Sequence, residues 1–146
     1  MKLKVKKLHP AAILPKYATQ GAACFDLHAV DCADQQVPAC MPTTVRTGLA
    51  FEVPHGHVML IFSRSGHGFK NDTRLANCVG VIDSDYRGEV LVRLTRDVSL
   101  SESLAIKSGD RIAQAMLVTL PWIQIVESDD LTDTERGAGG FGSTGQ

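Results

Sequence analysis

The sequence has no excess of charge of either sign. Fifteen lysine and arginine residues stand against 16 aspartate and glutamate residues in a chain of 146, which gives a formal net charge of -1. No global electrostatic field would therefore recruit a nucleic acid or an anionic membrane surface. Any phosphate that the protein binds must be held by groups close to it.

The sequence also has no long apolar run. The stretch from Met1 to Leu8 alternates apolar residues with lysines and lacks the continuous apolar region of a signal peptide. No run elsewhere approaches the roughly 20 apolar residues of a membrane-spanning helix. These absences predict a cytoplasmic protein whose partners include neither a nucleic acid nor a membrane.

Cysteine patterns typical of metal sites are missing. The four cysteines, Cys24, Cys32, Cys40 and Cys78, form no CxxC pair. No histidine stands at the spacing of a recognisable zinc-ligand set. We therefore interpret the cysteines as free buried thiols, since most of them stand near apolar residues.

A sustained helical period is absent, and no repeat of fixed length is found. Instead, short alternating or continuously apolar stretches are separated by turn residues, which is typical of β-strands. The predicted strands are residues 3–8, 24–29, 45–53, 58–62, 77–82, 89–94, 102–107, 111–119 and 122–127. The pattern predicts an all-β protein, a jelly-roll-like β-sandwich with at most one short helix, after Gly66.

The C-terminal stretch departs from this pattern. Between Arg136 and Gly145 glycine recurs too often for a strand, and Phe141 is the one large apolar residue. We predict a sandwich core at residues 1–128 and a flexible, glycine-rich arm at residues 129–146. The arm has no GxxxxGK[ST] sequence, yet its arginine, ring and hydroxyl groups could bind a nucleoside triphosphate. A tail without function has the same composition.

Residues 80–90 predict an acidic β-hairpin with a tight turn, in which Gly88 would take the left-handed conformation. Asp83 and Asp85 would share one face. A carboxylate beside Tyr86 could activate a water molecule or hold a metal. Taken alone, the same residues are better explained as a solvated turn, because aspartate is common in turns.

Two other places combine polar groups with a predicted strand. Arg64, Ser65 and Gly66 follow the strand at 58–62, and such a loop offers an arginine, a hydroxyl and backbone N–H groups to phosphate oxygens. An ordinary loop could contain the same three residues. Gln114 lies inside another predicted strand, where its amide could instead satisfy a backbone group.

Five separated stretches match the motifs of a single family. They are residues 22–27, 64–66, 80–88, 111–114 and 136–145. In this order and spacing they resemble the trimeric, all-β deoxyuridine triphosphate nucleotidohydrolases, or dUTPases, over nearly the whole chain. The third and fifth stretches are long and specific, so a chance match of all five is very improbable.

The resemblance implies a reaction and its catalytic groups. In this family dUTP is hydrolysed to dUMP and pyrophosphate by water that attacks the α-phosphorus, and Asp83 would be the general base. Mg²⁺ would bridge the triphosphate oxygens, and Asp26 would hold water molecules of its shell. The reaction would lower dUTP and supply dUMP for thymidylate synthesis.

The resemblance also implies which residues bind the substrate. The residues that bind the phosphates would be Arg64, Ser65, Gly66 and Gln114. Those for the uracil would be Asn77, through its amide, and Val81 and Ile82, through backbone groups that cytosine could not match. Tyr86 and Leu91 would line the deoxyribose pocket, and the tyrosine would exclude a ribose.

The glycine-rich arm would close over the bound substrate. Phe141 would cover the uracil and Arg136 the phosphates, while Gly142, Ser143 and Thr144 would lie at the γ-phosphate end. The family also implies a homotrimer whose sites lie at subunit boundaries. One chain would lend the phosphate loops, another the hairpin and a third the arm.

Two residues depart from the family pattern. Cys24 stands where glycine is usual, so a β-carbon must fit there, and Ser63 stands where proline often precedes the arginine, which predicts a looser phosphate loop. Two other functions remain open. A dCTP deaminase or bifunctional deaminase would need a proton shuttle at the C4 amino group, and it would not be expected to have the glycine-rich arm. A nucleotide-binding regulator without turnover is disfavoured by the retained Asp83 and Arg136.

Overall fold

The computed structural model describes residues 1–97, 104–140 and 143. Its elements are β1 (Lys4–Lys7), β2 (Phe25–His28), β3 (Gln35–Val37), β4 (Thr43–Arg46), β5 (Leu49–Glu52), β6 (His57–Phe62), α1 (Ser65–Asn71), β7 (Thr73–Leu75), β8 (Gly80–Ile82), β9 (Leu91–Arg96), β10 (Leu104–Ile106) and β11 (Arg111–Thr119). The predicted all-β class with one short helix is confirmed for this part of the chain. No helix within the described ranges is long and apolar enough to cross a membrane.

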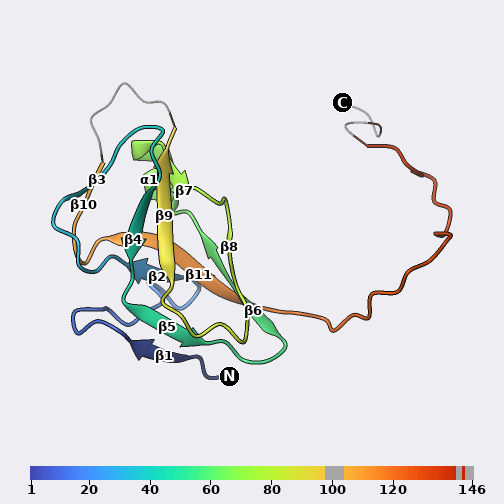
Figure 1. Cartoon of the computed structure of the whole chain (residues 1–146), viewed down its shortest axis with the longest axis horizontal. Helices are drawn as coiled ribbons and strands as arrows, with labels where there is room; N and C mark the ends of the chain where they lie inside the picture. Colours follow the sequence, from blue (N-terminus) through green and yellow to red (C-terminus); the bar gives the residue numbers. More distant parts are fainter. Residues whose placement is uncertain (98–103, 141–142, 144–146) are drawn as a thin grey trace.

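Two larger antiparallel sheets form the body of the molecule (Figure 1). One has the strand order β2-β11-β6-β8 and the other the order β4-β9-β7, while β1-β5 and β3-β10 form two-stranded pairs. β11 is the longest strand and pairs with β2 on one side and β6 on the other. Gln114 therefore lies opposite Asp26 on one neighbour and opposite Phe62 on the other.

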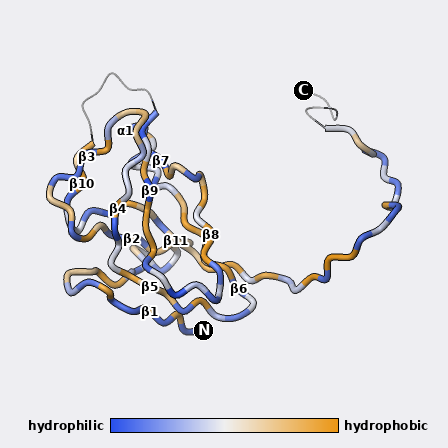
Figure 2. The backbone as a smooth tube through the Cα atoms, in the orientation of Figure 1, coloured by the Kyte–Doolittle hydropathy of each residue, from blue (hydrophilic) through white to orange (hydrophobic). Residues whose placement is uncertain are grey.

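Alternate positions of the strands supply the core. Phe25 and Leu27 of β2 are buried, and so are Val92 and Leu94 of β9. The residues between them face outward, as expected for strands with one buried face. Figure 2 shows β1, in which three of the four residues are lysines, mostly in the hydrophilic colour. Polar groups on the outer faces, Asp26 among them, are thereby presented on a rigid sheet.

The prediction of a single strand at 45–53 is wrong. The chain breaks between β4 and β5, which pair with β9 and β1 respectively. At the break Gly48 has a φ of 64°, and the buried Thr47 hydroxyl donates to the Val90 carbonyl at 2.6 Å. Every second residue from Val45 to Val53 is buried, so the apolar alternation runs on through the break.

The prediction of a buried strand at 77–82 is wrong in its length and its burial. Only the last three of these residues form β8, and Val81 is 60% exposed. Before β8 the backbone turns, with a φ of 63° at Cys78 and a hydrogen bond from the Val79 N–H to the Asn77 carbonyl at 2.7 Å. A left-handed residue cannot continue a strand, so pairing begins only after it.

The predicted hairpin is also wrong, because residues 83–90 connect two sheets. β8 pairs with β6, whereas β9 pairs with β4 and β7. Gly88 is not among the positive-φ residues. A β-carbon at Gly88 would lie 2.6 Å from Cζ of Tyr86, so a larger residue there would displace the tyrosine ring. The tyrosine folds back over Gly88, and its hydroxyl donates to the Glu89 carbonyl at 3.0 Å.

The predicted strand at 122–127 is not formed. After β11 the chain leaves the body as an extended segment (Figure 1). Trp122 and Ile125 are each 91% exposed, and Ile123 and Val126 are exposed as well. A strand needs a partner, and the described part of this single chain provides none for these residues.

All four cysteines are free, as predicted, but only two are sheltered. Burial raises the pKa of the Cys24 thiol, with Asp26 adding to the shift, and burial also raises the pKa of the Cys32 thiol. Cys40 and Cys78 are exposed, so the prediction of buried thiols is wrong for these two. Both have positive φ, which places them in turns rather than in strands.

Candidate active site

An open pocket of about 290 Å³ lies where residues 83–90 join β8 to β9. We call it the Asp83 pocket, and its lining residues are Val81, Ile82, Asp83, Tyr86, Glu89, Val90 and Leu91. Five of these seven were predicted as site residues, so the structure brings the predicted base, strand and sugar contacts together. Asn77 does not line this pocket; its amide donates to the Val79 carbonyl at 3.3 Å.

The strand that enters this pocket has a free edge. β8 is the last strand of its sheet and pairs only with β6 among the described elements. Its outer edge therefore offers backbone N–H and C=O groups of the type that pair with another strand. A planar group with alternating donors and acceptors could bind there.

Glu89 stabilises the pocket, and sequence reasoning missed this role. Its carboxylate accepts hydrogen bonds from Arg46 Nε at 3.2 Å and from the Gly48 N–H at 2.8 Å. These bonds attach the connection 83–90 to the break between β4 and β5. The partners are more than 40 residues away in sequence, so no local pattern could have revealed them.

A second set of polar groups surrounds Asp26 on the outer face of β2. Its carboxylate oxygens lie 3.3 Å from Arg64 Nε and 3.3 Å from Arg111 Nη1. Arg64 also donates to the Arg111 carbonyl at 3.0 Å. The Asp26 side chain is only 17% exposed, so these charges interact with less solvent screening than surface pairs.

Arg64 directly precedes helix α1 and lies with other predicted residues in a second open pocket. This Arg64 pocket has a volume of about 440 Å³, and its lining residues are Ser63, Arg64, Ser65, Gly68, Phe69, Thr73, Arg74 and Gln114. No side chain caps the helix at Arg64. Three predicted phosphate residues are thus brought together, while Gly66 lies beside them in the helix without lining the pocket.

Gln114 is engaged with the protein in this structure. Its amide nitrogen donates to the Ser63 carbonyl at 2.9 Å. The structural role considered for this residue is therefore present, and the same side chain also lines the Arg64 pocket. Ser63 does not leave the loop loose as expected, because its hydroxyl accepts the Leu75 N–H at 2.9 Å.

His28 lies close to these charges and carries little charge of its own near neutral pH. Burial lowers its pKa below the ordinary value, Asp26 opposes this shift, and Arg111 and Arg64 reinforce it. With a neutral His28, the charges of the cluster are those of one carboxylate, Asp26, and two guanidinium groups, Arg64 and Arg111. The cluster therefore has a net positive character that suits phosphate oxygens.

The residues do not form a ready-made metal cage. In the described ranges no group of three histidine, cysteine, aspartate or glutamate side chains could hold a metal ion. Asp26 is the predicted metal residue, and both of its oxygens face guanidinium groups. An ion at this place would have to be held mainly by water and by the substrate.

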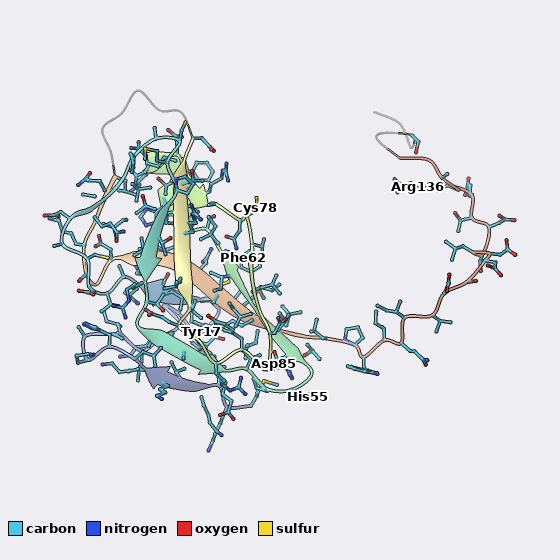
Figure 3. All side chains as sticks on the ribbon, in the orientation of Figure 1. Tyr17, His55, Phe62, Cys78, Asp85 and Arg136 are labelled. Carbon is cyan, nitrogen blue, oxygen red and sulfur yellow. The ribbon has the colours of Figure 1, made fainter. Side chains whose placement is uncertain are left out.

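The two pockets share no lining residue and lie at opposite ends of β6. Ile82, just before Asp83, pairs with Met59 near the start of β6, whereas Arg64 follows the last residue, Phe62. The ends of this six-residue strand are about 16 Å apart. Figure 3 accordingly places Asp85 near His55, away from Phe62. One chain therefore does not bring the predicted base to its own phosphate residues.

The arm lies away from both pockets. Figure 3 shows Arg136 at the far end of the extended segment. Its Nε donates to the Gly139 carbonyl at 2.8 Å, and the Ser143 N–H donates to the Gly140 carbonyl at 3.1 Å. These are local contacts within the arm. Three further predicted residues, Phe141, Gly142 and Thr144, lie outside the described residues.

Comparison with known proteins gives relatives over the whole length. The chain is 46% identical over 146 residues to the deoxyuridine 5'-triphosphate nucleotidohydrolase of Nautilia profundicola, with all of both chains covered. It is 38% identical over 146 residues to the enzyme of the same name from Helicobacter pylori strain J99, covering 99% of this chain and 97% of that one.

Solved structures with the same fold come from staphylococcal phages. The 80alpha phage dUTPase G164S mutant with dUpNHpp has a TM-score of 0.85 at 23% identity, covering 99% of both chains. The phage phi11 dUTPase has a TM-score of 0.79 at 20% identity, covering 92% of this chain and all of that one. At these identities the likeness shows the fold alone. The family model for dUTPase matches residues 11–145, and with the near-complete relatives above this shows that the chain belongs to the dUTPase family.

Proposed function

We propose that the protein hydrolyses dUTP to dUMP and pyrophosphate, with Asp83 as the general base for a water molecule that attacks the α-phosphorus. The observation that carries this proposal is the Asp83 pocket, where the predicted base lies among Val81, Ile82, Tyr86 and Leu91. Membership of the dUTPase family supports the substrate. The proton of the water passes to the Asp83 carboxylate, and pyrophosphate leaves as the bond to the α-phosphorus breaks.

Uracil recognition is proposed for the free edge of β8. Backbone groups at Val81 and Ile82 donate to and accept from the uracil, and cytosine presents the wrong pattern of donors. Tyr86 excludes a 2′-hydroxyl because its ring is fixed by the bond from its hydroxyl to the Glu89 carbonyl. Leu91 lines the same pocket. Asn77 would reach the base after its amide releases the Val79 carbonyl.

Phosphate binding is proposed for Arg64, Ser65 and Gly66, with Gln114 at the edge of the same pocket. Arg64 can place its planar guanidinium against two phosphate oxygens. To do so it must leave Asp26 or the Arg111 carbonyl, its two partners here. Arg111, which also pairs with Asp26, keeps the carboxylate neutralised during that change.

Mg²⁺ is the proposed cofactor, and the chain fits it as an ion bound through water. Mg²⁺ retains several waters and is often held by one carboxylate and the substrate phosphates. Asp26 offers one carboxylate, and among the described residues it belongs to no group of three potential metal ligands, which agrees with that mode. When bound, the ion supplies charge neutralisation to the triphosphate. Asp26 would orient its water shell, and the base and the loop act without contacting the ion.

The glycine-rich arm is proposed to close over the substrate. Arg136 would neutralise phosphate charge, Phe141 would cover the uracil, and Gly142, Ser143 and Thr144 would lie at the γ-phosphate. The described contacts of Arg136 and Ser143 are made within the arm, so closure breaks no bond to the body. The boundary between core and arm at residue 128 belongs to the same proposal.

A homotrimer with shared sites is the proposed assembly. The separation of the Asp83 and Arg64 pockets supports it, because each is incomplete without the other. The exposed apolar residues Trp122 and Ile125 support it too, since they need cover. An apolar pocket of about 410 Å³ on the body, bordered by Leu3, Phe25 and Leu117 among others, could provide such cover in a neighbouring chain. The proposed role in the cytoplasm is to lower dUTP and to supply dUMP for thymidylate synthesis.

Pyrophosphate release from dUTP, dCTP, dTTP and UTP, with and without Mg²⁺, tests this function. We expect release from dUTP alone and only with the metal. Ammonia released from dCTP would instead identify a deaminase. Tight dUTP binding without any pyrophosphate would identify a regulator that has no turnover.

A further inference from the structure

Two side chains that have no assigned role flank the Arg64 loop, which we define as residues 64–66. Ser63 precedes the loop and makes contacts on two sides. Its hydroxyl accepts the Leu75 N–H of β7 at 2.9 Å, and its carbonyl accepts Gln114 Nε2 of β11 at 2.9 Å. The residue before the arginine is therefore fixed by two hydrogen bonds to two different strands.

The bond to β7 depends on the serine hydroxyl. Proline, which is frequent at this position in the family that the sequence resembles, has no such oxygen. Proline restrains its own backbone, whereas Ser63 is restrained by a tertiary contact with Leu75. The two residues can thus give the loop the same fixed start by different physical means.

His67 follows the loop and forms a hydrogen bond to the same backbone carbonyl as Arg64. Its Nε2 lies 2.8 Å from the Arg111 carbonyl oxygen, and Arg64 Nη1 donates to the same oxygen at 3.0 Å. Because a carbonyl only accepts hydrogen bonds, the proton of the imidazole must lie on Nε2. Nδ1 of His67 is buried and has no hydrogen-bond partner among the described residues, so the contact with Arg111 is what orients the ring.

This geometry permits Arg64 to change partners without leaving an orphaned acceptor. When the guanidinium turns from the Arg111 carbonyl to a phosphate, His67 still donates to that oxygen. Without His67 the same movement would leave the exposed Arg111 carbonyl with neither side-chain donor, so water would have to replace both. Ser63 meanwhile keeps the backbone of the loop in place.

We propose that Ser63 and His67 are positioning residues for phosphate binding, acting through Arg64. Ser63 fixes the start of the loop, and His67 secures the Arg111 carbonyl so that Arg64 is free to bind the triphosphate. This inference rests on the proposed function and deepens it. It concerns substrate binding and not the chemical step.

The test is a set of single variants. Ser63→Ala and His67→Leu should each raise the KM for dUTP by about 5- to 10-fold, the effect of one lost hydrogen bond, with kcat nearly unchanged. Ser63→Thr keeps the hydroxyl and His67→Gln keeps an N–H donor, so both should retain a KM near that of the original protein. Far-UV circular dichroism checks that each variant is folded.

Ser108→Ala is the matched control for Ser63→Ala. The Ser108 hydroxyl also accepts a backbone N–H, that of Cys32, at 2.9 Å, but Ser108 lines neither pocket. Because this hydroxyl also donates to the Cys32 carbonyl at 3.1 Å, its loss should lower stability by at least as much as Ser63→Ala and leave the KM unchanged. An equal rise of the KM in Ser108→Ala would show that the effect at Ser63 is general destabilisation and would refute the inference.

A double-mutant cycle separates positioning from a purely structural role. In an Arg64→Ala background, adding Ser63→Ala or His67→Leu should change the dissociation constant for inorganic tripolyphosphate, measured by calorimetry, by less than about twofold, because the group through which they act is gone. Additive effects would contradict the proposal.

Binding of inorganic tripolyphosphate, measured by calorimetry on the full chain, separates this inference from the proposed function. Suppose that the original protein leaves dUTP intact, but that Ser63→Ala binds tripolyphosphate about 5- to 10-fold more weakly than the original protein, the loss expected for one hydrogen bond. That result would refute the proposed function and support the inference. If the original protein hydrolyses dUTP and Ser63→Ala and His67→Leu have the same KM as the original, the inference alone is refuted.

Discussion

Asp83 and Asp85 offer a direct test of the catalytic base. They are two residues apart and both exposed, but only Asp83 lines the pocket with Tyr86. Asp83→Asn keeps the shape and removes the proton acceptor, so kcat should fall by about 10²- to 10⁴-fold. Affinity for a non-hydrolysable imido analogue of dUTP should stay within about threefold, because binding does not need the base. Pyrophosphate release and calorimetry measure the two quantities.

Asp85→Asn is the matched control for this change. It removes a carboxylate from the same turn, and we expect kcat within about twofold of the original protein. Substantial turnover by Asp83→Asn, or equal loss in both variants, would rule out Asp83 as the specific base.

At the residue scale, the motifs identified side chains that line the two pockets better than side chains that hold those residues in place. Five of the seven residues that line the Asp83 pocket and three of the eight that line the Arg64 pocket were identified from sequence. Glu89 and His67 were missed because their hydrogen-bond partners lie 41 and 44 residues away. Such contacts depend on strand register, which local patterns do not determine.

At the scale of elements, the break between β4 and β5 depends on Gly48. Its φ is 64°, and a β-carbon there would lie 2.9 Å from Cβ of His9 and 3.0 Å from Cβ of Ala12. Gly48→Ala should therefore lower the free energy of unfolding by about 2–4 kcal/mol, from left-handed strain and crowding together. Urea unfolding at a fixed protein concentration measures the change.

Gly56→Ala separates the two contributions to that loss. Gly56 has a φ of 75°, but a β-carbon there would meet nothing within 4 Å. Only the backbone strain applies, so we expect a loss of about 1 kcal/mol. Equal losses at both positions would show that crowding at Gly48 contributes nothing.

The arm can be removed as an element. A chain that ends at Glu135 loses Arg136 and the glycine-rich stretch, and kcat should fall by about 10³-fold if the arm supplies charge to the transition state. The body should stay folded, because the described hydrogen bonds of Arg136 lie within the arm. Pyrophosphate release and thermal unfolding by circular dichroism measure these effects.

Full-length Arg136→Ala shows how much of that loss belongs to one cation. If Arg136→Ala lowers kcat less than truncation does, the remaining loss of kcat belongs to the rest of the arm. An unchanged rate in the truncated chain would exclude the arm as a lid.

The strands that sequence predicted well are those with a long, continuous alternation. β11 has the predicted bounds of 111–119, because two neighbouring strands support its whole length. β3 and β7 have three residues each, too few to establish a period. The apolar pattern at 122–127 would indicate burial correctly if a partner covered it, but no residue in the described part of the chain does so.

At the scale of the whole molecule, one chain carries the parts of a site without assembling them. The Asp83 and Arg64 pockets have separate linings, and the arm lies away from both. The sequence could identify these parts through motifs, but it could not show their separation, since that follows from the pairing of β8 with β6. Oligomerisation is the simplest way to unite them.

Mixed trimers test this arrangement. If each site takes Arg64 from one chain and Asp83 from another, Arg64→Ala chains and Asp83→Asn chains are inactive alone but complementary together. After equal amounts are unfolded and refolded together, a site is intact when its Arg64 comes from an Asp83→Asn chain and its Asp83 from an Arg64→Ala chain. Random assembly makes about a quarter of the sites intact, so about a quarter of the original activity should return. A mixture that stays as inactive as its components, although trimers form by sedimentation, would mean that base and phosphate loop act within one chain.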